Sequence, residues 1–109
     1  MNSIDTIRLS ERQKQQLIVL KRKTGIENWN VLCRWALCMS LADTTTPPNE
    51  DIPSDSNVEM SWKTLTGEWD LVYQCLLKQA EKQNKNHKSI NELIKIHLSR
   101  GISLLILRW

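Results

Sequence analysis

The side chains of this chain that could carry out a reaction are two histidines, three cysteines, and the serines and carboxylates. A nucleophile needs a base within hydrogen-bond reach, and no recognisable motif surrounds His87 or His97. The cysteines lack CxxC spacing, the carboxylates lack the spacing of a calcium loop, and no glycine-rich phosphate loop occurs. We therefore predict a protein that is not an enzyme, with no catalytic residue, no metal site and no cofactor, and with its cysteines reduced in the core.

The remaining chemistry is electrostatic, because charge is divided unevenly along the chain. Residues 1–42 carry a net charge of +4, residues 43–62 carry −5 with five acids and no base, and residues 63–109 carry +4. The basic charge thus lies outside one acidic loop. Two interpretations stay open: an ordinary solvated surface, or a surface that faces a polyanion such as DNA.

A helix predicted over residues 11–24 would position the first group of cations. Ser10 and Gln13 form a capping-box pattern, and Gly25 supplies the left-handed stop. At 100° per residue, Leu9, Gln13, Leu17, Leu20 and Thr24 form a stripe that faces the core. Arg12 and Lys23 then lie on the opposite side of the helix, and their directions differ by about 20°. Three adjacent cations, called the basic cluster below, are alternatively explained as charges that complement the helix dipole. The candidate phosphate contacts are the basic cluster (Lys21, Arg22 and Lys23), then Lys14 and Arg12, with Arg34 as a lesser candidate.

The second predicted helix, residues 28–42, is apolar nearly all round. Such a helix is expected to be buried on every side, which is hard to arrange in a domain of 109 residues without another subunit. Arg34 interrupts the apolar run, and we interpret it as a salt-bridge anchor or as an anion contact. The five tryptophans form either the core or part of an oligomer interface.

The remaining pattern predicts a mainly α fold. Residues 4–9 could form a short N-terminal strand or an extended lead-in. Residues 43–61 indicate a long acidic loop whose tail is a strand or an extended segment, and residues 68–83 and 89–101 indicate two further helices. Residues 102–107 could extend the last helix or form a strand. We predict a compact four-helix single domain over residues 1–109. No long apolar run or leader occurs, so we expect a cytoplasmic protein that spans no membrane.

Several blocks of sequence together resemble the DndE family of DNA sulfur-modification proteins. They are LKRKTGI (20–26), NVLCRWALCMSL (30–41), TLTGEWDLVYQCLL (64–77) and HLSRGISLL (97–105). The resemblance covers nearly the whole chain except the acidic loop. None of the blocks is a catalytic signature, so the resemblance depends on their coincidence and order.

The resemblance implies a role in the Dnd system, which replaces a non-bridging phosphate oxygen of DNA by sulfur. Its other proteins are a cysteine desulfurase, an iron-sulfur enzyme and an ATPase. Members of the DndE family are understood as compact helical homotetramers that bind DNA, favouring nicked duplex, with no chemical step of their own established. The family's DNA-contacting segment maps onto Lys21, Arg22 and Lys23, which agrees with the charge pattern.

Two alternative functions stay open. The start of the chain is also similar to a ribbon-helix-helix module, in which paired strands read the major groove and which would make the protein a sequence-specific repressor. Residues 4–9 offer only Thr6 and Arg8 as outward base-reading side chains. The other alternative is a protein-interaction adaptor that does not contact DNA.

Overall fold

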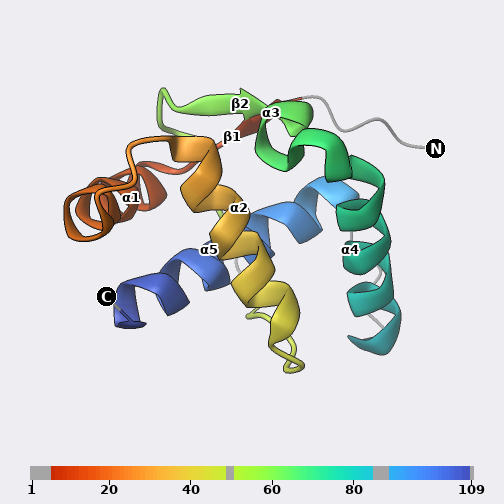
Figure 1. Cartoon of the computed structure of the whole chain (residues 1–109). Helices are drawn as coiled ribbons and strands as arrows, with labels where there is room; N and C mark the ends of the chain where they lie inside the picture. The colour runs from red at the N-terminus through yellow and green to blue at the C-terminus, as the bar shows by residue number, and fades with distance from the viewer. Residues whose placement is uncertain (1–5, 49–50, 85–88, 109) are drawn as a thin grey trace.

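The computed structural model describes residues 6–48, 51–84 and 89–108. His87 and the first two residues of the predicted N-terminal strand lie outside these ranges. Figure 1 shows a mainly helical molecule with a small sheet at one edge, as predicted. The elements are β1 (Thr6–Arg8), α1 (Glu11–Thr24), α2 (Trp29–Ala42), β2 (Glu59–Ser61), α3 (Trp62–Thr66), the 3-10 turn η1 (Gly67–Trp69), α4 (Asp70–Asn84) and α5 (Ile90–Arg108).

Local signals set both ends of α1. The Ser10 hydroxyl accepts a hydrogen bond from the Gln13 amide at 3.1 Å, and the Gln13 side chain accepts one from the Ser10 amide at 2.9 Å. Gly25 ends the helix at a φ of 76°, a conformation that costs a residue with a Cβ about 1 kcal/mol or more. The predicted bounds of this helix are therefore confirmed, and its buried stripe includes Gln13, Leu17 and Leu20.

The core is built around the pair α2 and α5, which cross at the centre of Figure 1. Gly101 lies at the crossing, where an added Cβ would overlap the Ala36 carbonyl group. The glycine therefore permits close helix packing and does not end the helix. Residues 102–107, for which the sequence left two possibilities, continue α5.

The sheet is a single antiparallel pair, with Thr6 opposite Ser61, Ile7 opposite Met60 and Arg8 opposite Glu59. Ile7 is buried, while its two neighbours on β1 face outward. The tail of the acidic loop thus forms a short strand, which is one of the two predicted conformations.

The segment before α4 differs from the prediction. The helix expected from residue 68 begins at Asp70, after the short helix α3 and the turn η1. The Ser61 hydroxyl caps α3 by accepting from the Thr64 amide at 3.0 Å. A five-residue helix is too short to show the periodicity on which the sequence prediction depended.

Helix α4 buries only a narrow stripe against the rest of the molecule. Tyr73 and Leu77 are buried, but other apolar side chains on this helix and just before it face outward. Their exposed fractions are 61% for Trp69, 58% for Leu71, 50% for Val72 and 42% for Leu76. Such an apolar surface on a small chain is a feature of sites of association.

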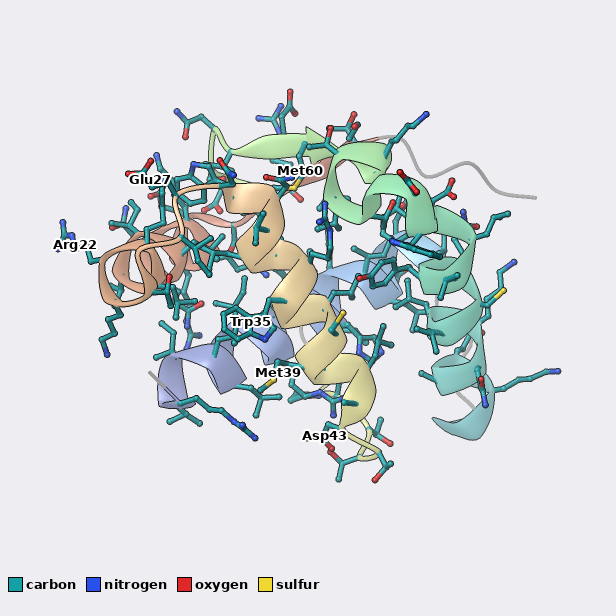
Figure 2. All side chains as sticks on the ribbon, viewed as in Figure 1. Arg22, Glu27, Trp35, Met39, Asp43 and Met60 are labelled. Atoms are coloured by element: carbon teal, nitrogen blue, oxygen red, sulfur yellow. The ribbon has the colours of Figure 1, made fainter. Side chains whose placement is uncertain are left out.

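Helix α2 is not buried on every side within one chain. Trp35 and Met39 are half-buried on the same side of the helix, as Figure 2 shows, and Cys38 is exposed. Among the helices of the described residues, none has both the length and the apolar character to cross a membrane.

Candidate nucleic-acid interface

The basic cluster occupies the last turn of α1, on the side of the molecule opposite α4 (Figure 1). Arg22 and Lys23 are exposed, and Figure 2 shows Arg22 pointing away from the fold. Within the part of the chain that the structure describes, neither side chain forms an ion pair or a hydrogen bond. Both cations are therefore available to an external anion.

Lys21 is held in place by an aromatic ring. Its Nζ lies 4.6 Å from the centroid of the Trp29 ring, a cation–π contact. The left-handed turn at Gly25 reverses the chain and brings the first residue of α2 beside the end of α1. Because the contact restricts the long lysine side chain, less conformational entropy remains to be lost when it meets a phosphate.

The last carbonyl groups of α1 obtain partners without the basic cluster. The Gly25 amide donates to the Lys21 carbonyl at 3.0 Å, and the Thr24 hydroxyl donates to the Leu20 carbonyl at 2.7 Å. The cluster still complements the negative end of the helix dipole, but these carbonyls do not depend on it for hydrogen bonds. Its side chains also offset the repulsion that this end of the dipole would exert on a phosphate.

Arg12 and Lys14 lie at the other end of α1, about 16 and about 14 Å from Lys23 along the helix axis at 1.5 Å per residue. Lys14 Nζ donates to Asn57 Oδ1 at 2.9 Å. Arg12 lines a cavity of about 400 Å³ together with two carboxylates of the acidic loop, Asp51 and Asp55. The structure therefore separates these two cations from the basic cluster, binds Lys14 to a neutral amide and places Arg12 at a cavity that two carboxylates also line.

Arg34 is engaged with the end of another helix. Its Nε donates to the Leu65 carbonyl at 2.7 Å, and its Nη2 donates to the Thr64 carbonyl at 3.3 Å. Asn30, one turn earlier on α2, reaches the same Thr64 carbonyl at 3.4 Å. These are terminal carbonyls of α3, which lack partners inside the helix. Of the two interpretations of Arg34, the anchor fits this geometry, although its partners are carbonyl groups and not a carboxylate.

A serine and a histidine that sequence reasoning did not pair meet in the core. Ser40 Oγ lies 2.7 Å from His97 Nδ1, and Arg100 Nε donates to the same hydroxyl at 2.9 Å. The tautomer of His97 decides whether the hydroxyl or Nδ1 is the donor in this pair. Burial, with the Arg100 charge as a second cause, lowers the pKa of His97 to about 4. Ser40 is 0% exposed, so this pair binds helices together and does not face a substrate.

The cysteines are only partly core residues, contrary to the prediction. Cys33 is buried, and burial raises the pKa of its thiol to about 12. Cys38 and Cys75 are exposed, because α2 and α4 each turn one side away from the core. Among residues 6–48, 51–84 and 89–108, no three His, Cys, Asp or Glu side chains are grouped so that they could hold a metal ion.

Comparison with known proteins places this fold in a family. A family model described as DNA sulphur modification protein DndE matches residues 6–108. The chain belongs to the DndE family. A search of curated proteins found no match.

Two crystal structures show that the fold of this DndE-family chain is shared. DndE from Escherichia coli, described as involved in DNA phosphorothioation modification, superposes with a TM-score of 0.76 at 24% identity, covering 96% of this chain and 99% of that one. A glycine-to-lysine mutant of DndE superposes with a TM-score of 0.71 at 23% identity, covering 93% and 95% of the two chains.

Two features of the site in this DndE-family chain had no signal in the sequence. The contact of Lys21 with Trp29 depends on the direction in which the chain leaves Gly25. The surroundings of Arg12 and Lys14 depend on residues about 40 positions away in the acidic loop. Periodicity relates residues on one element and cannot place two elements against each other.

Proposed function

We propose that this DndE-family chain is a non-catalytic DNA-binding component of the DNA phosphorothioation machinery. It holds duplex DNA, preferentially nicked, through backbone phosphates. The other Dnd-system proteins carry out the chemistry, and the cytoplasm is the expected location. Family membership supports the link to DNA sulfur modification, and the remainder of the proposal depends on the geometry of α1.

One observation carries the proposal: Arg22 and Lys23 are exposed and unpaired among the described residues, beside a lysine fixed on Trp29. Three cations in one helical turn can neutralise neighbouring phosphates. A nick leaves the phosphates on both strands and makes the duplex easier to bend, which lets a rigid cationic surface approach more of them.

Contacts to phosphate position a protein on DNA but do not read its sequence. Affinity should therefore vary little between random duplexes and fall steeply with salt. The geometry gives little support to base reading by β1. One edge of the strand pairs with β2 of the same chain, and Arg8 donates to Glu59 at 2.8 Å and to the Ser56 carbonyl at 3.4 Å.

The test is a fluorescence-anisotropy titration of nicked, intact and random duplexes with the wild-type protein and a variant carrying Lys21→Glu, Arg22→Glu and Lys23→Glu. We expect the variant to bind at least about a hundredfold more weakly at about 0.1 M salt, because each phosphate contact contributes several-fold there. The matched control reverses three exposed cations away from α1, namely Lys63, Lys78 and Lys82. Because two of these lie on α4, sedimentation velocity checks that wild type, variant and control have the same oligomeric state.

The two alternative functions give different outcomes. Equal losses in the variant and its control would attribute binding to overall charge and contradict the proposed site. An adaptor would leave DNA binding at background in every protein while sulfur modification still fails in the variant. A repressor would prefer one palindromic sequence by a factor of about a thousand or more.

We also propose that the chain works as a homotetramer. The exposed apolar side chains of η1 and α4, with Trp69 the largest, support self-association. Several copies of the basic cluster on one assembly would bind one duplex together, which raises affinity without any new type of contact.

A further inference from the structure

The second half of the acidic loop is fastened along the start of α1. We call residues 51–58 the acidic strap. The Ser56 hydroxyl and amide donate to the Leu9 carbonyl at 2.7 and 3.2 Å, and the Leu9 amide donates to the Val58 carbonyl at 3.0 Å. Ser56 is buried. The strap is therefore an integral part of the fold and not a solvated tail.

The acidic strap places its charges on the N-terminal end of α1. Asp55 Oδ1 accepts from the Glu11 amide at 2.8 Å, which is the favourable end of the helix dipole for an anion. Asp51 and Asp55 share the lining of one cavity with Arg12. Next to the strap, Glu59 pairs with Arg8 at 2.8 Å. Residues 51–59 thus hold Arg8 in an ion pair and Lys14 in a hydrogen bond. Arg12 is exposed and has no ion pair in the described ranges, but it shares its cavity with two carboxylates of the strap.

At the C-terminal end of α1, Glu27 and Glu59 line a cavity with Trp29, the residue that Lys21 contacts. The residues of the basic cluster that are exposed have no ion-pair partner in the described ranges. The Glu11 amide, to which Asp55 is bound, lies about 15 to 18 Å along the helix axis from the basic cluster, which is about twice the Debye length of about 8 Å at physiological salt. The strap therefore acts on Arg12 and Lys14 but hardly on the basic cluster under these conditions.

We infer that the acidic strap is an intramolecular competitor of DNA. It occupies the N-terminal end of α1, keeps phosphates away from Arg12 and Lys14, and confines the DNA to the basic cluster. This inference rests on the proposed DNA-binding function. It names the acidic strap as the segment that limits the area of the protein in contact with DNA. It revises the role of Arg12 and Lys14 from direct contacts to masked ones.

The test compares the wild-type protein with an Asp51→Asn/Asp55→Asn variant in the same anisotropy titration over a salt series. An asparagine at position 55 can still accept the hydrogen bond from the Glu11 amide, so α1 keeps its cap. We expect affinity to rise about three- to tenfold at about 0.1 M salt, and the slope of log affinity against log salt to steepen by about 1 for each recruited phosphate contact. Adding Arg12→Ala to the variant should remove most of this gain.

The control Glu68→Gln/Glu81→Gln changes the net charge equally on η1 and α4, on the other side of the molecule. Because these elements form the proposed subunit interface, sedimentation velocity checks that control and wild type have the same oligomeric state. An equal gain in the control, or a gain that survives Arg12→Ala, would overturn the inference and attribute the effect to net charge. If the double variant fails to fold, Asp51→Asn alone leaves the Asp55 cap intact and should give part of the gain. Failure of the proposed function looks different: the wild-type protein would then bind no DNA, or would be indifferent to reversal of the basic cluster.

Discussion

His97 is a titratable side chain that the fold keeps neutral. It is 2% exposed, and Arg100 lies on the other side of the Ser40 hydroxyl that it contacts. A second proton on the ring would add a positive charge beside the guanidinium in a buried site. Burial is the main cause of its pKa of about 4, and the Arg100 charge is the second.

This burial predicts that stability falls in acid. In the unfolded chain a histidine titrates at about 6.5, so between about pH 6.5 and pH 4 the unfolded state binds a proton that the folded state does not. The free energy of unfolding therefore decreases as the pH falls through this window, by up to about 3 kcal/mol from His97. Urea denaturation at pH 7.5, 6, 5 and 4.5 measures the decrease.

The control is His97→Gln, which keeps a polar side chain but does not titrate. Its free energy of unfolding is expected to be lower at every pH, since an amide replaces a well-packed ring. The quantity to compare is therefore the slope of the free energy of unfolding against pH. Between pH 6.5 and 4.5 the variant should lose less stability than the wild-type protein. Parallel curves for the two proteins would contradict the assignment.

Two arginines close the carbonyl ends of helices in this fold. Arg100 donates to the Ser40 carbonyl at 2.7 Å and to the Thr45 carbonyl at 2.6 Å, just beyond α2. Arg34 does the same for α3 at Leu65 and Thr64. Helix ends leave unpaired carbonyls, and a guanidinium with several donors can satisfy two of them at once.

We therefore interpret Arg34 as a residue that stabilises the fold. Replacing it shows whether its main effect is on stability or on DNA affinity. We expect Arg34→Gln to lower the free energy of unfolding by about 2 kcal/mol, because charged hydrogen bonds to the terminal carbonyls of α3 are lost. DNA affinity of the folded variant should stay within about twofold of wild type, less than the loss of one phosphate contact. Urea denaturation and anisotropy on the same samples measure both.

Arg34→Lys provides the matched control, since it keeps the charge but cannot donate in two directions. It should lose about as much stability as the glutamine variant. A normal stability with weakened DNA binding in Arg34→Gln would place this arginine at the interface instead.

Elements with strong local signals could be predicted from the sequence, and elements made by tertiary contact could not. The bounds of α1 follow from Ser10, Gln13 and Gly25, all within or next to the helix. Helix α3 depends on a serine cap and on Arg34, which lies about 30 residues earlier. The role of Gly101 was equally hidden, because only the crossing with Ala36 reveals it.

The same distinction applies to the candidate site. The exposure of Arg22 and Lys23 was predictable, because they lie opposite the buried stripe of one helix. The contact of Lys14 with Asn57 and the cavity that Arg12 shares with Asp51 and Asp55 were not, since the acidic loop appeared in the sequence only as a segment of negative charge. A loop's contacts depend on the whole fold, which composition does not describe.

At the scale of the whole molecule, the basic cluster and the apolar surface of α4 lie on opposite sides (Figure 1). Self-association through α4 would therefore leave every cluster facing outward. A single cluster offers only three cations, and three phosphate contacts alone give weak binding at physiological salt. Assembly is the means by which this small chain would reach a useful affinity.

The last prediction tests that dependence with Trp69→Ser/Leu76→Ser, which removes two exposed apolar side chains without touching the core. We expect sedimentation velocity to show the wild-type protein as a tetramer and the variant as a smaller species. DNA affinity should fall at least about tenfold although every basic residue is present, because binding through linked copies is lost. Gln79→Ser, an exposed polar position on α4, should change neither measurement. A variant that remains a tetramer would exclude this face as the subunit interface, and a smaller species with unchanged affinity would show that one cluster is sufficient for DNA binding.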